Sequence, residues 1–139
     1  MKAEEKELLK LFEPLRVADV RDGMDWMGYH HYGTLSHQIR PLFRTKAVGI
    51  AKTARYLPYE GPAVTLTGDD YTAWSNNYYS EICIYPWAKD ELDGYFMAID
   101  VSGVDAGLMG SENALGCKMA GCRGFVLNGG GIRDTDECI

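Results

Sequence analysis

Three charged side chains near the end of the chain have the types and the spacing that chemistry on a small acid requires. Twenty residues, 113–132, separate Glu112 from the pair Arg133-Asp134. The planar guanidinium of an arginine can hold the oxygens of a 2-oxo acid, and an aspartate beside it can hold a hard cation such as Mg²⁺. A glycine-rich turn, residues 128–131, precedes the pair. Such backbone freedom is costly unless the chain must pass close to another group.

The sequence around this pair predicts a strand-helix-strand unit. Residues 94–101 and 124–127 are continuous apolar runs, which are typical of strands covered on both faces. Residues 112–121 carry apolar side chains at helical spacing, with Ser111 as a good N-cap and Gly121 as a stop. Such a unit favours a parallel strand pair with a right-handed crossover and predicts an α/β fold.

This unit would bring the charged groups to one rim of the sheet. Arg133 and Asp134 follow the carboxyl end of a strand, where open α/β sheets bind ligands. The helix would begin at the same edge, where its free backbone amides attract anions. Those amides belong to Asn113, Ala114 and Leu115. We expect Arg133 and the amides to hold a carboxylate ligand, Asp134 to bind the metal ion, and Glu112 to orient or deprotonate a water on that ion.

A simpler interpretation of the same residues stays open. Arg133 could form an ordinary surface ion pair with Asp134, Asp136 or Glu137, and such pairs are common and contribute little energy. An Arg-Asp dipeptide alone would favour that interpretation. The three consecutive glycines before it favour a functional site.

The rest of the chain predicts two helices and shorter extended pieces. Residues 3–13 place leucines and a phenylalanine on one helical stripe, and residues 17–26 form a second amphipathic segment closed by a glycine. Residues 46–57 alternate as a strand, with one internal glycine that permits close backbone approach. Residues 62–67 form another extended piece, and a turn at residues 68–70 follows.

Three further features have two interpretations each. The tyrosines and tryptophans of residues 71–90 could stack on a ligand, but aromatic residues at helical spacing more often form a core or a subunit interface. His30-His31 could bind a metal, but adjacent side chains diverge and a structural role is more common. Cys117 and Cys122 lack the spacing of zinc sites, so burial as small apolar residues is the simpler interpretation.

Size and composition are those of one ordinary globular domain, residues 1–139, with 46% hydrophobic and 24% charged residues. A net charge of -6 and a pI near 5.0 argue against nucleic acid as a partner, because phosphate binding needs clustered Lys and Arg. No segment resembles a signal peptide or a membrane span, so we expect a cytoplasmic protein with no membrane partner. The small core favours a homo-oligomer.

The run from Gly110 to Glu137, GSENALGCKMAGCRGFVLNGGGIRDTDE, resembles the family of the regulator of ribonuclease E activity (RraA-like). That family also contains 4-hydroxy-4-methyl-2-oxoglutarate aldolases and was formerly misnamed demethylmenaquinone methyltransferase. Three upstream segments are similar to the family's first helix beside the active site, its Gly-x-Ala-x-Thr strand and its central strand. These segments are VADVRDGMDWMG, IRPLFRTKAVGIAKTARY and GYFMAIDVSG. The resemblance covers most of the chain.

The resemblance implies a layered sandwich around a central mixed, partly parallel sheet, in a trimeric or hexameric ring with active sites between subunits. It also implies a class II pyruvate aldolase site that uses Mg²⁺ or Mn²⁺. Arg133 would bind the 2-oxo oxygen and stabilise an enolate, and Glu112 would be the acidic residue that acts through water. The amides of Asn113 and Ala114 would hold the pyruvate carboxylate. The metal ligands would be Asp134 and Glu137.

The chain departs from the family pattern in three places. Ser111 and Asn113 stand where members usually have glycine and leucine, and residues 69–93 are longer and more aromatic than the common form. The sequence stops at Ile139, where members commonly continue with a further strand and helix. We therefore expect the C-terminal part of the family fold to be missing.

The predicted function is that of a divalent-metal-dependent lyase acting on a small 2-oxo acid. The reaction would be retro-aldol cleavage of a 4-hydroxy-2-oxo acid to pyruvate, or decarboxylation of oxaloacetate, each through an enolate. One alternative is a protein-binding module like the ribonuclease regulator, whose acidic surface would cover a basic segment of its partner. The other is an inactive, truncated paralogue that serves as an assembly subunit.

Overall fold

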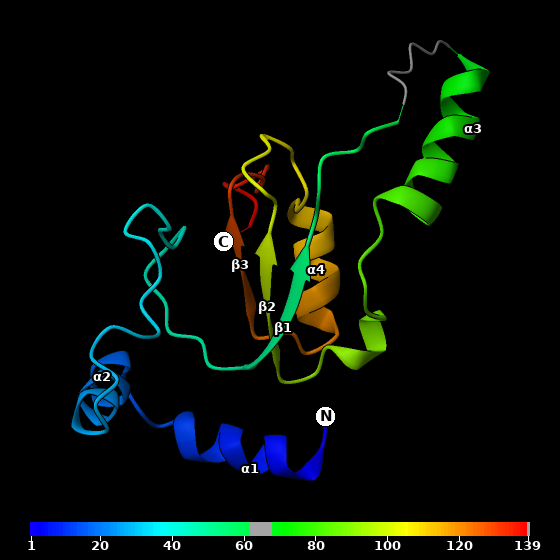
Figure 1. The fold of residues 1–139 in the computed structure, drawn as a ribbon. Helices are drawn as coiled ribbons and strands as arrows, with labels where there is room; N and C mark the ends of the chain where they lie inside the picture. The colour runs from blue at the N-terminus through cyan, green and yellow to red at the C-terminus, as the bar shows by residue number, and fades with distance from the viewer. Residues whose placement is uncertain (62–67, 139) are drawn as a thin grey trace.

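Three parallel strands form the centre of the chain in a computed structural model, which describes residues 1–61 and 68–138. The strands are β1 (Ile50–Arg55), β2 (Tyr95–Asp100) and β3 (Gly124–Asn128), and they lie in the order β1-β2-β3 (Figure 1). Helix α4 (Ser111–Met119) connects β2 to β3 and lies over one face of the sheet. The predictions of an α/β fold and of a parallel strand pair around a helix are confirmed.

Both strand pairs are regular. Each residue of β1 and each residue of β3 has a partner in β2, so Arg55, Asp100 and Asn128 lie in one row at the carboxyl ends. β1 is shorter than the predicted strand over residues 46–57. At Gly49, an added Cβ would lie 2.8 Å from the Cβ of Phe96, so the glycine allows the close backbone approach that the sequence predicted.

The core lies between α4 and the sheet. Its buried side chains are Leu92, Met97, Ile99, Val101, Met109, Cys117 and Leu127. α4 contributes Cys117 to this set, while Leu115 and Met119 on the same helix are 59% and 81% exposed. The interpretation of Cys117 as a small buried residue is confirmed. The face of α4 that is buried against the sheet is therefore narrow.

The opposite face of the sheet is only thinly covered. A hollow of about 260 Å³ lies on this face, with Leu35 and Ile39 on one side and strand residues such as Thr53, Ala98 and Val126 on the other. Ala98 is half-buried, so the prediction that the strand at 94–101 is covered on both faces is wrong within this chain. The reason is that α4 covers the other face, whereas the loop at residues 35–39 lies against this one.

Two amphipathic helices begin the chain, as predicted. They are α1 (Ala3–Phe12) and α2 (Val17–Trp26), and in each the carboxylate of the third helical residue caps the backbone just before the helix. The carboxylates of Glu5 and Asp19 accept hydrogen bonds of 2.7 Å from the backbone amides of the capping residues. α1 buries Leu9, whereas α2 buries no residue and stands away from the core (Figure 1).

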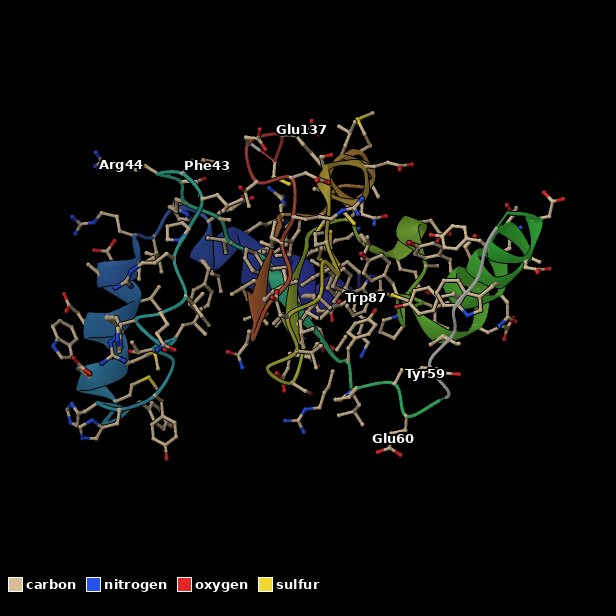
Figure 2. The ribbon with its side chains drawn as sticks, turned by 90° about the horizontal axis from the view of Figure 1, so that it is seen from above. Phe43, Arg44, Tyr59, Glu60, Trp87 and Glu137 are labelled. Carbon is tan, nitrogen blue, oxygen red and sulfur yellow. The ribbon has the colours of Figure 1, made fainter. Side chains whose placement is uncertain are left out.

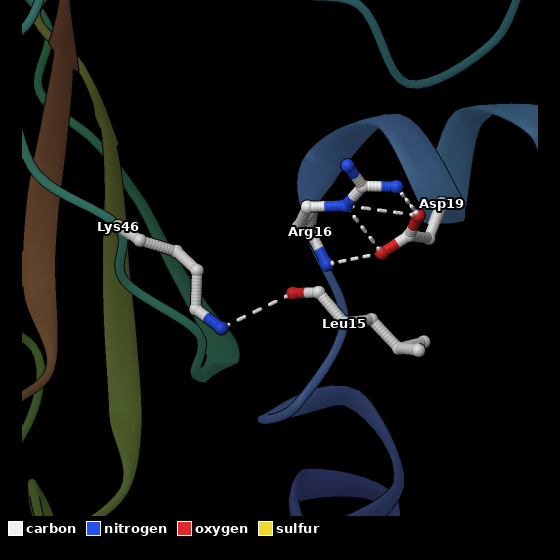
Figure 3. Close-up of polar contacts among 4 residues, drawn as sticks. All are labelled: Leu15, Arg16, Asp19 and Lys46. Atoms are coloured by element: carbon white, nitrogen blue, oxygen red, sulfur yellow. Dashed lines mark hydrogen bonds and ion pairs between the residues drawn. The ribbon is translucent and has the colours of Figure 1, made fainter.

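Lys46 ties the segment before β1 to the connection between α1 and α2. Its ammonium group donates to the carbonyl oxygen of Glu13 at 2.6 Å. It also donates to the carbonyl oxygen of Leu15 at 3.2 Å (Figure 3). Next to it, the Arg16 guanidinium donates to the Asp19 carboxylate at 2.6 Å and, together with the Arg16 amide, lowers the pKa of Asp19 to about 2. These contacts hold the start of α2 next to the segment that precedes β1.

The aromatic stretch forms α3 (Asp69–Asn77), a π-helical turn η1 (Tyr78–Ile82) and a short 3₁₀ turn η2 (Lys89–Glu91). A turn was predicted at residues 68–70, but only Gly68 lies in a turn, because α3 begins at Asp69. Carboxylates in the first turn suit the positive end of the helix dipole. α3 and η1 bury no residue, but Tyr85 and Trp87 pack against the core. The predicted extended piece at 62–67 lies outside the described residues.

Candidate functional site

The glycine turn after β3 lies against the loop that follows β2. A Cβ at Gly129 would lie 2.5 Å from the backbone nitrogen of Gly103, and one at Gly131 would overlap the carbonyl oxygen of Ala106. The prediction that the chain passes close to another group here is confirmed. That group is the loop at residues 103–106, because only glycine lets two backbones approach so closely.

Two backbone hydrogen bonds extend this contact to Arg133. The amide of Met109 donates to the carbonyl of Gly131 at 3.0 Å, and the amide of Arg133 donates to the carbonyl of Met109 at 2.9 Å. Met109 and Ile132 thus form a parallel bridge. Arg133 is therefore held beside Gly110, where α4 begins.

We expect Gly131→Ala to destabilise the protein by at least about 2 kcal/mol. Gly131 has a φ of 58°, which costs an L-residue about 1–2 kcal/mol, and the new Cβ would also displace the loop at residue 106. Gly103→Ala is the matched control, since Gly103 has a φ of 75° but no atom within 4 Å of an added Cβ. Urea unfolding of both variants measures the difference. Equal losses would contradict the close backbone contact.

The side chains of Arg133 and Asp134 lie across two glycines at the start of α4. A Cβ at Gly110 would lie 2.8 Å from Asp134 Oδ2 and 3.1 Å from Arg133 Nε, and one at Gly107 would lie 3.0 Å from Arg133 Cδ. The two side chains form an ion pair, with Nε 3.3 Å from Oδ2. The Arg133 side chain is 70% exposed, so this pair contributes little to stability. Gly107 and Gly110 carried no sequence signal beyond their positions in the loop after a strand.

The first turn of α4 differs from the prediction. Gly110 is the N-cap and Ser111 is the first helical residue. The amide of Ala114 donates to the carbonyl of Gly110 at 2.9 Å, so the prediction that Ala114 is free to hold a carboxylate is wrong. Leu115 lies one residue further inside the helix. Asn113 is one of the first three residues, whose amides have no partner within a helix.

Three carboxylates surround this turn. Glu137 Oε2 accepts a hydrogen bond from the hydroxyl of Ser111 at 2.8 Å. The Ser111 hydroxyl therefore bonds to Glu137 and does not cap the helix. Asp134 lies beside Gly110. Glu112 is exposed and has no hydrogen-bond or ion-pair partner among the residues that the structure describes. The positive end of the helix dipole favours carboxylates at these positions.

The carboxylates of this turn suit a hard cation that keeps part of its water shell, and in the described part of the chain they do not form a site closed by several protein ligands. Within residues 1–61 and 68–138, no three His, Cys, Asp or Glu side chains are grouped to hold a metal ion. Mg²⁺ needs only one or two protein carboxylates, because it keeps waters and takes oxygens from its ligand. Asp134 pairs with Arg133 through Oδ2 and has Oδ1 left for such an ion. Asp134 also has a φ of 54°, a sparsely populated backbone conformation that is frequent at functional sites.

A second polar group lies at the carboxyl ends of the strands. Arg55 Nε donates to Asp100 Oδ2 at 2.8 Å, and Asn128 Nδ2 donates to Asp100 Oδ1 at 3.4 Å. The Arg55 guanidinium and the Ser102 amide lower the pKa of Asp100. Sequence reasoning missed this row, because its members come from three separate strands. The sequence feature that could have revealed the row is the polar residue at the end of each strand.

Two of the other candidate ligands, His30 and Cys122, have local partners. His30 Nδ1 is 3.5 Å from Asp25 Oδ1 in the loop after α2. The thiol of Cys122 donates to the carbonyl of Gly124 at 3.3 Å. Cys138 lies near the site, with its thiol 3.9 Å from the Arg133 carbonyl oxygen, and burial raises the pKa of that thiol.

Comparisons of the chain with protein-family models, curated proteins and solved structures gave no match. None of the helices in the described part of the chain has the length and apolar character needed to cross a membrane.

Proposed function

We propose that this chain is an RraA-like lyase that cleaves or decarboxylates a small 2-oxo acid with the help of Mg²⁺ or Mn²⁺. The observation that carries the proposal is the position of Arg133 and Asp134 over Gly107 and Gly110, at the carboxyl ends of parallel strands and at the start of α4. A guanidinium, a carboxylate and free helix amides then meet at one rim. These are the groups that a 2-oxo acid and a hard cation require.

Each side chain has a role that follows from its chemistry. Arg133 binds the 2-oxo oxygen through the guanidinium nitrogens that Asp134 does not use, and it stabilises the negative charge that develops there. The amide of Asn113 and its two predecessors in the helix hold the substrate carboxylate. Glu112, which is exposed and unpaired among the described residues, moves a proton through water.

A divalent ion would be held by Asp134, with Glu137 as a second oxygen donor from the same turn. When bound, such an ion supplies Lewis-acid polarisation of the substrate oxygens. Ser111 already donates to Glu137 Oε2, so Glu137 has one oxygen left for the ion or for a water on it. This donor set is poor for zinc, which prefers nitrogen and sulfur ligands.

We also propose the layered RraA-like arrangement and a trimer or hexamer as its assembly. The open sheet face supports this proposal, since parallel sheets are normally covered on both faces. Residues 71–87 would then contribute exposed aromatic surface to contacts between subunits, as the unburied helices α3 and η1 suggest.

The test is pyruvate formation from oxaloacetate and from 4-hydroxy-4-methyl-2-oxoglutarate, each with Mg²⁺ and after addition of EDTA. We expect turnover that depends on the protein and on the metal. Because divalent ions alone accelerate oxaloacetate decarboxylation, the blank contains the same Mg²⁺ and heat-denatured protein. Pyruvate release at the blank rate from both acids would contradict the proposed lyase activity. Full activity in EDTA would show that the reaction does not need the metal ion.

A further inference from the structure

The charges of this chain are separated along its length in an unusual way. Residues 26–55 contain five Lys or Arg and no Asp or Glu, whereas residues 56–88 contain four Asp or Glu and no Lys, Arg or His. Within these stretches we call residues 28–46 the basic arm and residues 68–84 the acidic arm. The acidic arm contains α3 and η1.

The two arms lie on opposite flanks of the sheet. Figure 1 shows the cyan loop of the basic arm on the β3 side and green α3 far out on the β1 side. The view from above agrees, with Phe43 and Arg44 on one side of the sheet and the green helix α3 far out on the other (Figure 2). A contact between the arms of one molecule is therefore excluded by distance in this fold.

The charges on both arms lack partners within the chain. Arg40 and Arg44 are exposed and form no hydrogen bond or ion pair with any described residue, and the same holds for Asp69, Asp70 and Glu81. Lys46 differs, because its ammonium group is already bound to the connection between α1 and α2. The arms thus present unpaired charges of opposite sign.

Apolar and aromatic surface accompanies these charges. Leu42 and Phe43, next to Arg44, are 43% and 44% exposed. On the acidic arm, four rings form a continuous ladder with centroid distances of 5.9, 5.0 and 5.3 Å. The ladder consists of Tyr71, Trp74, Tyr78 and Tyr79. Tyrosine and tryptophan faces attract guanidinium groups, so the ladder suits an arginine-bearing partner.

We propose that the basic arm of one copy docks on the acidic arm of a second copy, with Arg40 and Arg44 against the acidic side chains and the ring ladder. Charge complementarity selects the partner, and the exposed apolar residues on both arms supply area to bury. Because the arms lie on opposite flanks, the contact is head-to-tail, and its repetition produces a ring or an open chain. The contact would supply the surfaces of the subunit assembly proposed above, and it does not depend on the proposed lyase activity.

The test is the mass of the full chain by light scattering, with two double variants. One is Arg40→Glu/Arg44→Glu and the other is Asp69→Lys/Asp70→Lys. Each variant alone should be monomeric, with association weakened by more than about a hundredfold, since like charges then face each other. An equimolar mixture should associate again into complexes in which the two variants alternate, because a reversed arm complements the other reversed arm as the wild-type arms complement each other. High salt should also weaken the wild-type assembly.

Lys6→Glu/Lys118→Glu is the matched control. Both lysines are exposed, without partners among the described residues, and outside the arms. This variant has the same net charge change as Arg40→Glu/Arg44→Glu and should stay assembled. Far-UV circular dichroism of every variant checks that the helices are retained. A monomeric wild-type protein, variants that assemble like the wild type, or a mixture that stays monomeric would each overturn the proposal.

Discussion

Arg133→Lys should lower the rate of pyruvate formation by about 30- to 1,000-fold, mainly in kcat. This corresponds to a loss of roughly 2–4 kcal/mol of transition-state stabilisation, the size of one lost oxyanion donor. Lysine keeps the charge but lacks the planar fork that can hold an oxo oxygen and a carboxylate together. The fold should be unaffected, because the Arg133 side chain is 70% exposed.

Arg55→Lys is a closely matched control for this experiment. The Arg55 side chain is also 70% exposed and also pairs with an aspartate through Nε, at 2.8 Å from Asp100 Oδ2. It lies at the end of β1 and has no role in the proposed reaction. We expect its turnover to stay near that of the wild type. Equal effects in the two variants, or unchanged turnover of Arg133→Lys, would favour the protein-binding or inactive-paralogue alternatives.

Asp134→Ala should abolish the metal-dependent activity without unfolding the protein. Asp134 is the carboxylate that lies over Gly110 beside Arg133, and its loss removes the ligand that the proposal requires. Because Asp134 has a φ of 54°, alanine also introduces a backbone cost of about 1–2 kcal/mol. Asp134→Asn is therefore the cleaner variant, since asparagine tolerates this conformation. Both should show weaker Mn²⁺ binding by calorimetry as well as lost turnover.

Asp136→Asn is the control on the same turn. Asp136 is exposed and has no hydrogen-bond or ion-pair partner in the part of the chain that the structure describes. Its substitution removes one negative charge but no proposed ligand, so Mn²⁺ binding and turnover should change little. Full activity of Asp134→Asn, or an equal loss in Asp136→Asn, would contradict the assigned metal ligand.

Stability and chemistry are separable at this site for a physical reason. The backbone of the turn is held by the bonds between Met109, Gly131 and Arg133 and by the glycine contacts with residues 103–106. The side chains of Arg133 and Asp134 add only an exposed ion pair. Substitution of either side chain therefore tests function, whereas substitution of Gly131 tests the fold.

Local sequence determined the elements that depend on neighbouring residues. The apolar spacing of α1 and α2 predicted both helices, and the two apolar runs with a helix between them predicted the parallel pair β2–β3. A glycine at residue 121, with a φ of 83°, ended α4 as expected. These features follow from backbone preferences and side-chain periodicity within a few residues, which any single segment carries by itself.

Tertiary structure alone decided which groups meet. The three glycines indicated a close approach, but only the fold shows that they approach residues 103–106. Ser111 had the chemistry of a cap, yet its hydroxyl bonds to Glu137, 26 residues away. The row of Arg55, Asp100 and Asn128 depends on strand register, and the separation of the basic and acidic arms depends on the path of the chain around the sheet. Contacts between distant residues follow from the packing of the whole chain, so local pattern could name these side chains but not their partners.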